Sequence, residues 1–200
     1  MTQVKLSTSS RNFKAIGAGK VLAYLRGDIQ KARKSLFVVG PWIDGYFVRE
    51  IIAVLHKDTS VRFLVRLGDS DDETARTTTL TSLNAVRSHV SNFEARSLPT
   101  LHAKVIIIDN NVGYIGSTNW YKYSLEQSLE VTLRLRLSAM PDLQGILDGY
   151  WKQADPIPKE EVEIALRGKL PEINHEILDP LARKVLEENP KAFVKRIKKE

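Results

Sequence analysis

The chain has 200 residues, is 42% hydrophobic and carries a formal net charge of +6, with a sequence pI near 9.5. These values are ordinary for a folded globular protein, and the absence of cysteine excludes disulfides and thiolate metal sites. No apolar run approaches the roughly 20 residues of a membrane-spanning helix, and the first residues lack the apolar core of a secretory signal, so we expect a soluble, cytoplasmic protein without membrane contact.

Helical and strand patterns alternate over the first hundred residues. After a polar start at residues 1–14, apolar residues recur at helical spacing, and short apolar runs typical of buried strands separate the helices. Asp44 stands where the N-cap of the second helix is expected. The predicted helices cover residues 18–34, 45–56 and the stretch from the loop at 68–72 to about residue 90, and the predicted strands cover 35–39, 60–67 and 93–98.

Trp42 follows the first of these strands. Ligands of α/β sheets bind beyond the carboxyl ends of parallel strands, so Pro41 and Trp42 are candidate walls of a site, and Trp42 could stack on a base or a sugar. The competing interpretation is that Trp42 only closes the edge of the core.

The most informative stretch is residues 101–119, LHAKVIIIDNNVGYIGSTN. A continuous apolar run at 105–108 predicts a buried strand, Asp-Asn-Asn is turn chemistry, and a second short run at 112–115 completes a hairpin. Residues two apart in a strand share a face, so His102 projects with Lys104, and Ser117 with Asn119. Because a hairpin brings the start of one strand beside the end of the other, we expect these four side chains to converge.

An imidazole, an ammonium, a hydroxyl and a carboxamide together suit phosphoryl transfer. The imidazole can attack phosphorus or protonate a leaving oxygen, and the lysine and amide can hold the oxygens on which transition-state charge develops. This chemistry needs no metal or other cofactor. Asp109 and Glu130 are candidates to orient an imidazole, as the carboxylate of a catalytic triad does.

The spacing of these residues, H-x-K-x₄-D-x₆-G-S-x-N, resembles the HKD signature of the phospholipase D superfamily. The resemblance implies that phosphodiester bonds are broken through a phosphohistidine on His102, and that Lys104, Asp109, Ser117 and Asn119 belong to the catalytic set. In that family a glutamate follows the G-S-x-N element at about the distance of Glu130. The specific part of the resemblance is residues 101–130, and the expected domain is a mixed sheet between helices.

The segment 128–137 is predicted to be the next strand, and an amphipathic helix is predicted over 141–153. If the strand is regular, Arg134 and Arg136 share a face with Glu130 and could extend the site as a phosphate-binding track, although a solvated strand edge explains them equally well. The whole pattern predicts an α/β fold, a mixed β-sheet flanked by helices on both faces, over residues 1–154.

Residues 155–200 are expected to form a small helical extension that follows a proline-rich linker at 155–158. Its last twelve residues hold five Lys or Arg against one Glu. Within it, Lys195 and Arg196 could grip a phosphate backbone, or the basic end could be a solvated tail. The basic balance of the chain favours a nucleic acid as partner, although an excess of this size could also serve solubility alone.

Only one H-x-K occurs in the chain. Substitution at phosphorus through a covalent intermediate needs a nucleophile on one side and an acid on the other, so the simplest solution is a two-fold homodimer that shares one site. The resemblance implies the same arrangement for single-motif members of the family. We therefore expect a metal-independent nuclease whose substrate is DNA or RNA, with DNA the favoured choice. The alternatives are a lipid-directed phosphodiesterase or phosphatidyltransferase, for which the sequence shows no interfacial apolar patch, and a non-catalytic nucleic-acid-binding module of a repair or defence complex.

Overall fold

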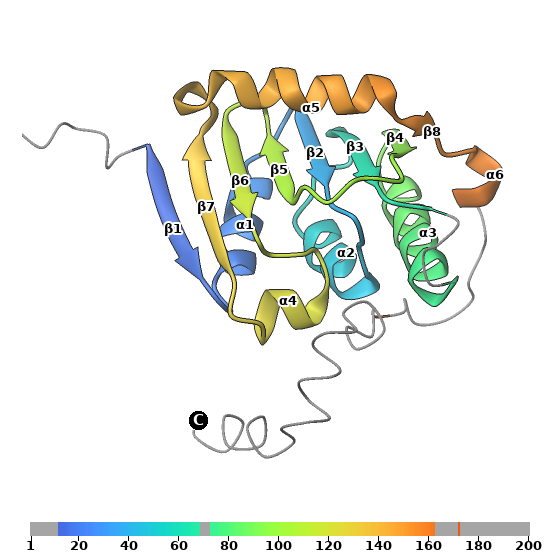
Figure 1. The fold of residues 1–200 in the computed structure, drawn as a ribbon, viewed down its shortest axis with the longest axis horizontal. Helices are drawn as coiled ribbons and strands as arrows, with labels where there is room; N and C mark the ends of the chain where they lie inside the picture. The colour runs from blue at the N-terminus through green and yellow to red at the C-terminus, as the bar shows by residue number, and fades with distance from the viewer. Residues whose placement is uncertain (1–11, 69–72, 163–171, 173–200) are drawn as a thin grey trace, which may run out of the picture.

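The computed structural model describes residues 12–68, 73–162 and 172. Eight strands within these residues form one mixed sheet in the order β1-β7-β6-β5-β2-β3-β4-β8 (Figure 1). The strands are β1 (Phe13–Gly17), β2 (Ser35–Val39), β3 (Ser60–Val65), β4 (Asn92–Ser97), β5 (Val105–Ile108), β6 (Val112–Gly116), β7 (Val131–Arg136) and β8 (Asp155–Pro156). The helices are α1 (Val21–Ile29), α2 (Gly45–Ile52), α3 (Glu73–Arg87), α4 (Lys122–Glu126), α5 (Pro141–Gln153) and α6 (Lys159–Val162). Strands β2, β3 and β4 are parallel and the remaining pairs are antiparallel, so the predicted mixed sheet is confirmed.

Helices cover both faces of the sheet, as predicted. On the central strand β2, Leu36 and Val38 join the core under α1, α2 and α3, whereas Phe37 and Val39 join a second core under α5. Phe37 meets Trp151 of α5 edge-on, with 5.5 Å between ring centroids. This strict alternation explains why the strand reads as a continuous apolar run, because both of its faces are buried.

The hairpin of β5 and β6 positions the predicted cluster. Its turn is made by Asp109 and Asn110, which have φ angles of 52° and 51°. Asp and Asn tolerate this left-handed conformation better than other non-glycine residues. The resulting register pairs Val105 with Ile115, so the residues before β5 lie beside the residues after β6.

Two predictions for the ends of the sheet were wrong. Strand β1 was not predicted, since Phe13–Gly17 is short and mixed in character and is held at the sheet edge by pairing with β7. The expected linker instead contributes β8, which pairs with Ser97 and Arg96 of β4, and α6 follows it with Val162 buried in the main core. The helices expected beyond α6, and the domain division that rests on them, lie outside the described residues. In the described part of the chain, no helix combines the length and the apolar character that crossing a bilayer requires.

Candidate active site

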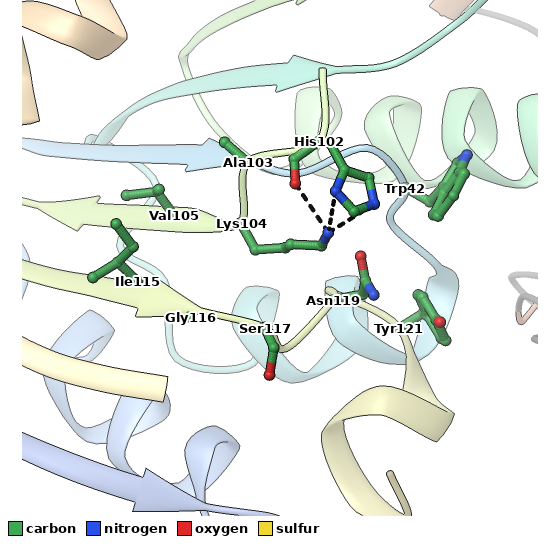
Figure 2. A pocket seen from close by; sticks show the side chains of 10 residues that line it. All are labelled: Trp42, His102, Ala103, Lys104, Val105, Ile115, Gly116, Ser117, Asn119 and Tyr121. Carbon is green, nitrogen blue, oxygen red and sulfur yellow. Dashed lines mark hydrogen bonds between the residues drawn. The ribbon is translucent and has the colours of Figure 1, made fainter. Parts of the chain in front are cut away.

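The four side chains expected to converge do line one pocket. Its volume is about 680 Å³, and it opens where β5 begins and β6 ends (Figure 2). The lining residues are Trp42, His102, Ala103, Lys104, Val105, Ile115, Gly116, Ser117, Asn119 and Tyr121. The pairing of Val105 with Ile115 causes the convergence, since it sets His102 and Lys104 on one strand against Ser117 and Asn119 beyond the other.

Lys104 and His102 form the polar centre of the pocket. The lysine side chain is buried, with 8% of it exposed, and its Nζ donates to the backbone carbonyl of His102 at 2.9 Å. The same Nζ lies 3.2 Å from Nδ1 and 3.1 Å from Nε2 of the imidazole. Dashed lines mark these contacts in Figure 2. The ammonium group of Lys104 is therefore held in contact with the imidazole ring of His102.

Electrostatics favour a neutral imidazole at this position. Partial burial, the nearby ammonium of Lys104 and the guanidinium of Arg66 all lower the pKa of His102. Burial also lowers the pKa of Lys104, and Arg66 adds to that effect, while the carboxylate of Glu130 opposes it. An unprotonated ring nitrogen is what an attack on phosphorus requires.

Glu130 is held beside the pocket by two serine hydroxyls. Ser117 Oγ donates to Glu130 Oε2 at 2.5 Å, and Ser124 Oγ donates to Oε1 at 2.8 Å. The backbone N–H of Val131 in turn donates to Ser117 Oγ at 3.2 Å. Within one chain, these contacts make Glu130 a partner of Ser117 and an electrostatic partner of Lys104, and its predicted role in orienting an imidazole stays a prediction.

Two buried polar atoms in the pocket wall lack a hydrogen-bond partner among the described residues. They are Oδ1 of Asn119 and Nε1 of Trp42. A buried polar group without a partner costs free energy, so such groups are rare and mark places where a ligand or water is received. The carboxamide of Asn119 points into the pocket in Figure 2. Both atoms are suited to contacts with a polar substrate.

Asp109 does not belong to the pocket, which corrects the expectation that it orients the imidazole. It lies at the far end of β5, where its carboxylate accepts hydrogen bonds from the backbone N–H groups of Arg33, Lys34 and Ser35 at 3.0, 2.8 and 2.9 Å. Burial alone would raise the pKa of Asp109, but these three hydrogen bonds outweigh it and lower the pKa. The carboxylate thus fastens the turn of the hairpin to the start of β2.

The proposed phosphate track on β7 is also wrong. Arg134 forms a two-pronged ion pair with Asp28 of α1, with distances of 2.6 and 2.9 Å, and the hydroxyl of Tyr114 donates to the same carboxylate. Arg136 pairs with Val112 at the end of β6 that lies away from the pocket. Both arginines therefore lie away from the pocket. Lys195 and Arg196, the other predicted contacts, lie outside the described residues.

Arg66 and Tyr121 were missed by the sequence analysis. Arg66 directly follows the parallel strand β3, and its guanidinium lies 4.3 Å from the ring centroid of Trp42. The rule that ligands bind beyond the carboxyl ends of parallel strands had singled out Trp42 and, applied to β3, would have found Arg66 as well. Trp42 fits both of its interpretations, because it lines the pocket and also packs against Tyr121 and Ala75.

Comparisons with known proteins agree with this geometry. The family described as "Cardiolipin synthase, PLD-like domain" matches residues 25–151, and no curated protein matches the chain. Among solved structures, the fold is similar to Nuc, a phospholipase D family member from Salmonella typhimurium, with a TM-score of 0.60 and 14% identity over 74% of this chain and 99% of that chain. It is also similar to NucT from Helicobacter pylori, with a TM-score of 0.58 and 16% identity over 72% and 98%.

A third similar structure is phosphatidylserine synthase from Haemophilus influenzae Rd KW20, with a TM-score of 0.58 and 12% identity. The match covers 92% of this chain but only 46% of that longer one. At these identities the structural likenesses show the fold alone, whereas the family match spans well over half of the chain. The chain therefore belongs to the phospholipase D superfamily of phosphodiesterases.

Proposed function

We propose that this protein is a metal-independent phosphodiesterase that cleaves nucleic acid through a covalent phosphohistidine on His102. DNA is the favoured substrate over RNA. The observation that carries the proposal is the single pocket lined by His102, Lys104, Ser117 and Asn119. Each of the four supplies a group that phosphoryl transfer uses, and they lie together although up to 17 positions separate them in the sequence.

The proposed first step forms a bond from an imidazole nitrogen of His102 to phosphorus and breaks the bond from phosphorus to the leaving oxygen. Lys104 and the carboxamide of Asn119 hold the non-bridging oxygens, on which negative charge rests in the transition state. The leaving oxygen takes a proton from a second imidazole on the opposite side. That imidazole then removes a proton from water, whose oxygen attacks phosphorus and releases His102.

The second imidazole must come from elsewhere than the same pocket. Of the other described histidines, His56 is exposed at the end of the α2 region and His89 contacts the backbone carbonyl of Leu55 near the end of α3. Neither lines the pocket. We propose that a second copy of the chain supplies its own His102, so that a two-fold dimer builds one shared site. The chain holds a single H-x-K, so each copy would supply one such histidine to the shared site.

Nucleic acid is favoured as substrate by the basic balance of the chain and by two aromatic side chains in the pocket wall, Trp42 and Tyr121. The guanidinium of Arg66 stacks on the ring of Trp42. Aromatic rings beside a cation suit stacked bases and a phosphate backbone. A lipid-directed phosphodiesterase is the second candidate, because exposed apolar side chains at Leu129 and Val131 adjoin the site. A binding module without turnover is disfavoured, since all six positions of the H-x-K-x₄-D-x₆-G-S-x-N signature and Glu130 are present in the sequence.

The test is cleavage of labelled single- and double-stranded DNA and RNA oligonucleotides in excess EDTA. Wild type is expected to cleave, His102→Ala to be inactive, and His56→Ala, a control at an exposed histidine, to match wild type. When the reaction with end-labelled oligonucleotide is quenched rapidly without acid, the label is expected to be covalently attached to the wild-type protein. No label is expected on His102→Ala. Dependence of cleavage on added metal, or hydrolysis of phosphatidylglycerol vesicles but of no oligonucleotide, would contradict the proposal.

A further inference from the structure

Ser124 lies behind the pocket and connects two residues of the predicted catalytic set. It belongs to α4, the short helix between the end of β6 and the start of β7 (Figure 1). The residue is buried, with 1% of it exposed, and it is not one of the residues that line the pocket. It also stands outside the H-x-K-x₄-D-x₆-G-S-x-N spacing, so no motif points to it.

The hydroxyl of Ser124 makes one hydrogen bond as acceptor and one as donor. Its Oγ accepts from the backbone N–H of Asn119 at 2.8 Å and donates to Oε1 of Glu130 at 2.8 Å. A hydroxyl carries a single proton, so its donor capacity is committed to this carboxylate. The main chain of Asn119 is therefore tied to the side chain of Glu130, although α4 separates the two residues in the sequence.

Ser117 makes the same kind of bridge on the other side of the carboxylate. Its Oγ donates to Oε2 of Glu130 at 2.5 Å and accepts from the backbone N–H of Val131 at 3.2 Å. Glu130 thus receives one hydroxyl donor on each oxygen, and a backbone N–H polarises each hydroxyl, an arrangement in which neighbouring hydrogen bonds strengthen one another. Because the proton of Ser117 is directed at Glu130, its oxygen offers only lone pairs to the pocket.

The carboxylate that Ser124 holds acts on the lysine of the pocket. Burial lowers the pKa of Lys104 and the guanidinium of Arg66 lowers it further, whereas Glu130 raises it. The neighbouring ring of His102 is in contact with the same ammonium. A lysine that stabilises charge on the phosphate oxygens must keep its proton, so a Glu130 side chain that moved away would weaken the site.

We propose that Ser124 is a positioning residue for phosphoryl transfer, because its one hydroxyl fixes both the main chain that carries the Asn119 carboxamide and the carboxylate that supports Lys104. The inference rests on the proposed function for the roles of Asn119 and Lys104. Displacing a catalytic group by about 1 Å can reduce the rate about 100-fold, so a residue that fixes two such groups controls the chemical step more than substrate binding. The alternative is that Ser124 only stabilises the loop between β6 and α4, as a buried hydroxyl with two hydrogen bonds can.

Steady-state kinetics on bis(p-nitrophenyl) phosphate, a small phosphodiester, distinguish the two roles. Ser124→Ala is expected to lower kcat about tenfold or more per folded molecule and to change KM by less than about threefold, because Ser124 does not line the pocket. Ser124→Thr keeps the hydroxyl and is expected to recover most of the loss. The control is Thr81→Val, which removes a buried hydroxyl that donates to the backbone carbonyl of Thr77 at 2.8 Å within α3, and its kcat should stay near wild type.

Two measurements by NMR need no turnover. In wild type, the amide proton of Asn119 is expected to exchange slowly with solvent, because Ser124 Oγ accepts it. With isotope-labelled lysine, the pKa of Lys104 is expected to be lower in Ser124→Ala than in wild type, and Lys104→Gln identifies the resonance. Circular dichroism establishes that each variant is folded. If Ser124→Ala does not fold, Ser124→Cys takes its place, since a thiol is a weak donor and acceptor.

Fast exchange of the Asn119 amide in wild type would overturn the inference. A folded Ser124→Ala protein with wild-type kcat, or with an unchanged pKa of Lys104, would do the same. A loss of rate that Thr81→Val reproduces and Ser124→Thr does not recover would assign Ser124 to stability alone. The nuclease proposal fails separately: a protein that cleaves bis(p-nitrophenyl) phosphate with the expected dependence on Ser124, but no oligonucleotide, would keep the inference and remove nucleic acid as substrate. A protein that cleaves neither would overturn both.

Discussion

The ammonium of Lys104 lies almost equally far from the two ring nitrogens of His102, 3.2 Å from Nδ1 and 3.1 Å from Nε2. A donor aimed at the lone pair of one nitrogen could not be equidistant from both without colliding with the carbon between them, so the cation faces the ring out of its plane. The in-plane positions of both nitrogens are thereby left to substrate and to an orienting group.

This contact predicts a shift in the titration of His102. Replacing Lys104 by Gln removes a cation that lowers the pKa of His102, so the pKa is expected to rise toward its ordinary value, and the neutral imidazole is lost at higher pH than in wild type. NMR of the ring protons over a pH series measures this, with His102→Gln identifying the resonance. Lys122→Gln, a lysine of α4 paired with Glu172, is the control. An unchanged or lower pKa in Lys104→Gln would contradict the electrostatic argument.

A second prediction follows from the placement of Asp109 away from the pocket. Asp109→Ala removes the acceptor of three backbone N–H groups and leaves alanine in a left-handed conformation, so the free energy of unfolding is expected to fall by about 2–4 kcal/mol. Asp109→Asn keeps one acceptor oxygen and tolerates the turn, so its loss is expected to be smaller. Urea unfolding monitored by circular dichroism measures both.

The pH dependence has a definite sign. Because the pKa of Asp109 is lower in the folded chain than in the unfolded chain, its contribution to stability is present above the unfolded pKa and is lost as pH falls through the folded one. The stability difference between wild type and Asp109→Asn is therefore expected to shrink as the solution becomes strongly acidic. Cleavage per folded molecule should be retained in Asp109→Asn. A variant of full stability without cleavage would return Asp109 to the catalytic set.

Local patterns were enough to predict the hairpin and its cluster. The apolar run at 105–108, the Asp-Asn-Asn turn and the next short run determine which strand ends meet, and this pairing places His102 near Asn119. Asp44 was identified correctly as a helix cap, since its carboxylate accepts from the N–H of Phe47 at 2.9 Å. In each case the interacting residues are close in sequence, so spacing alone carries the information.

Long-range partners could not be predicted in this way. The donors to Asp109 lie 74 to 76 positions away, and the ion pair of Arg134 with Asp28 spans 106 positions. Strand β1 is defined by its pairing with β7, near the other end of the domain. The polar side chains of the pocket are therefore close together in the sequence, whereas the contacts that hold the hairpin and the sheet edge in place come from distant parts of the chain.

Gly116, in the G-S-x-N element, gives a third prediction. A Cβ at this position would overlap the carbonyl oxygen of Val131 and the Cα of Thr132, both backbone atoms of the neighbouring strand. Gly116→Ala is therefore expected to push β6 from β7, to lower the free energy of unfolding by about 1–3 kcal/mol or more, and to displace Ser117. Cleavage by the remaining folded protein should fall.

Gly113→Ala is the matched control on the same strand. The nearest atom to its new methyl is a side-chain carbon of Leu135 at 3.3 Å, which can move aside. Thermal melts and cleavage assays of Gly116→Ala and Gly113→Ala are compared. The comparison distinguishes steric overlap with the backbone of β7 from the general effect of replacing a glycine in a strand. Equal effects in the two variants would mean that Gly116 is required only as a small residue and not for the approach of β7.

Arg66 carries the last prediction, because it is the cation that sequence analysis overlooked. Its guanidinium stacks on Trp42 of the pocket wall and lowers the pKa values of both His102 and Lys104, and we expect it to attract a bound phosphate. Arg66→Ala is expected to weaken oligonucleotide binding by His102→Ala protein about tenfold or more, the value of one charge-assisted hydrogen bond. The dependence of log affinity on log salt concentration should become shallower by about one contact.

A matched control and a second readout separate this role from general charge. Arg26→Ala removes an exposed arginine of α1 that pairs with Glu50, and it should leave both affinity and salt dependence near wild type. In Arg66→Ala the pKa of His102 is expected to rise, an effect that a purely structural stacking role on Trp42 would not produce. Arg66→Lys should restore part of the wild-type lowering of this pKa and part of the affinity, since a lysine keeps the charge but not the planar fork. If affinity, salt dependence and the pKa of His102 all stay unchanged, Arg66 only packs against Trp42, and phosphate recognition rests on Lys104 and Asn119.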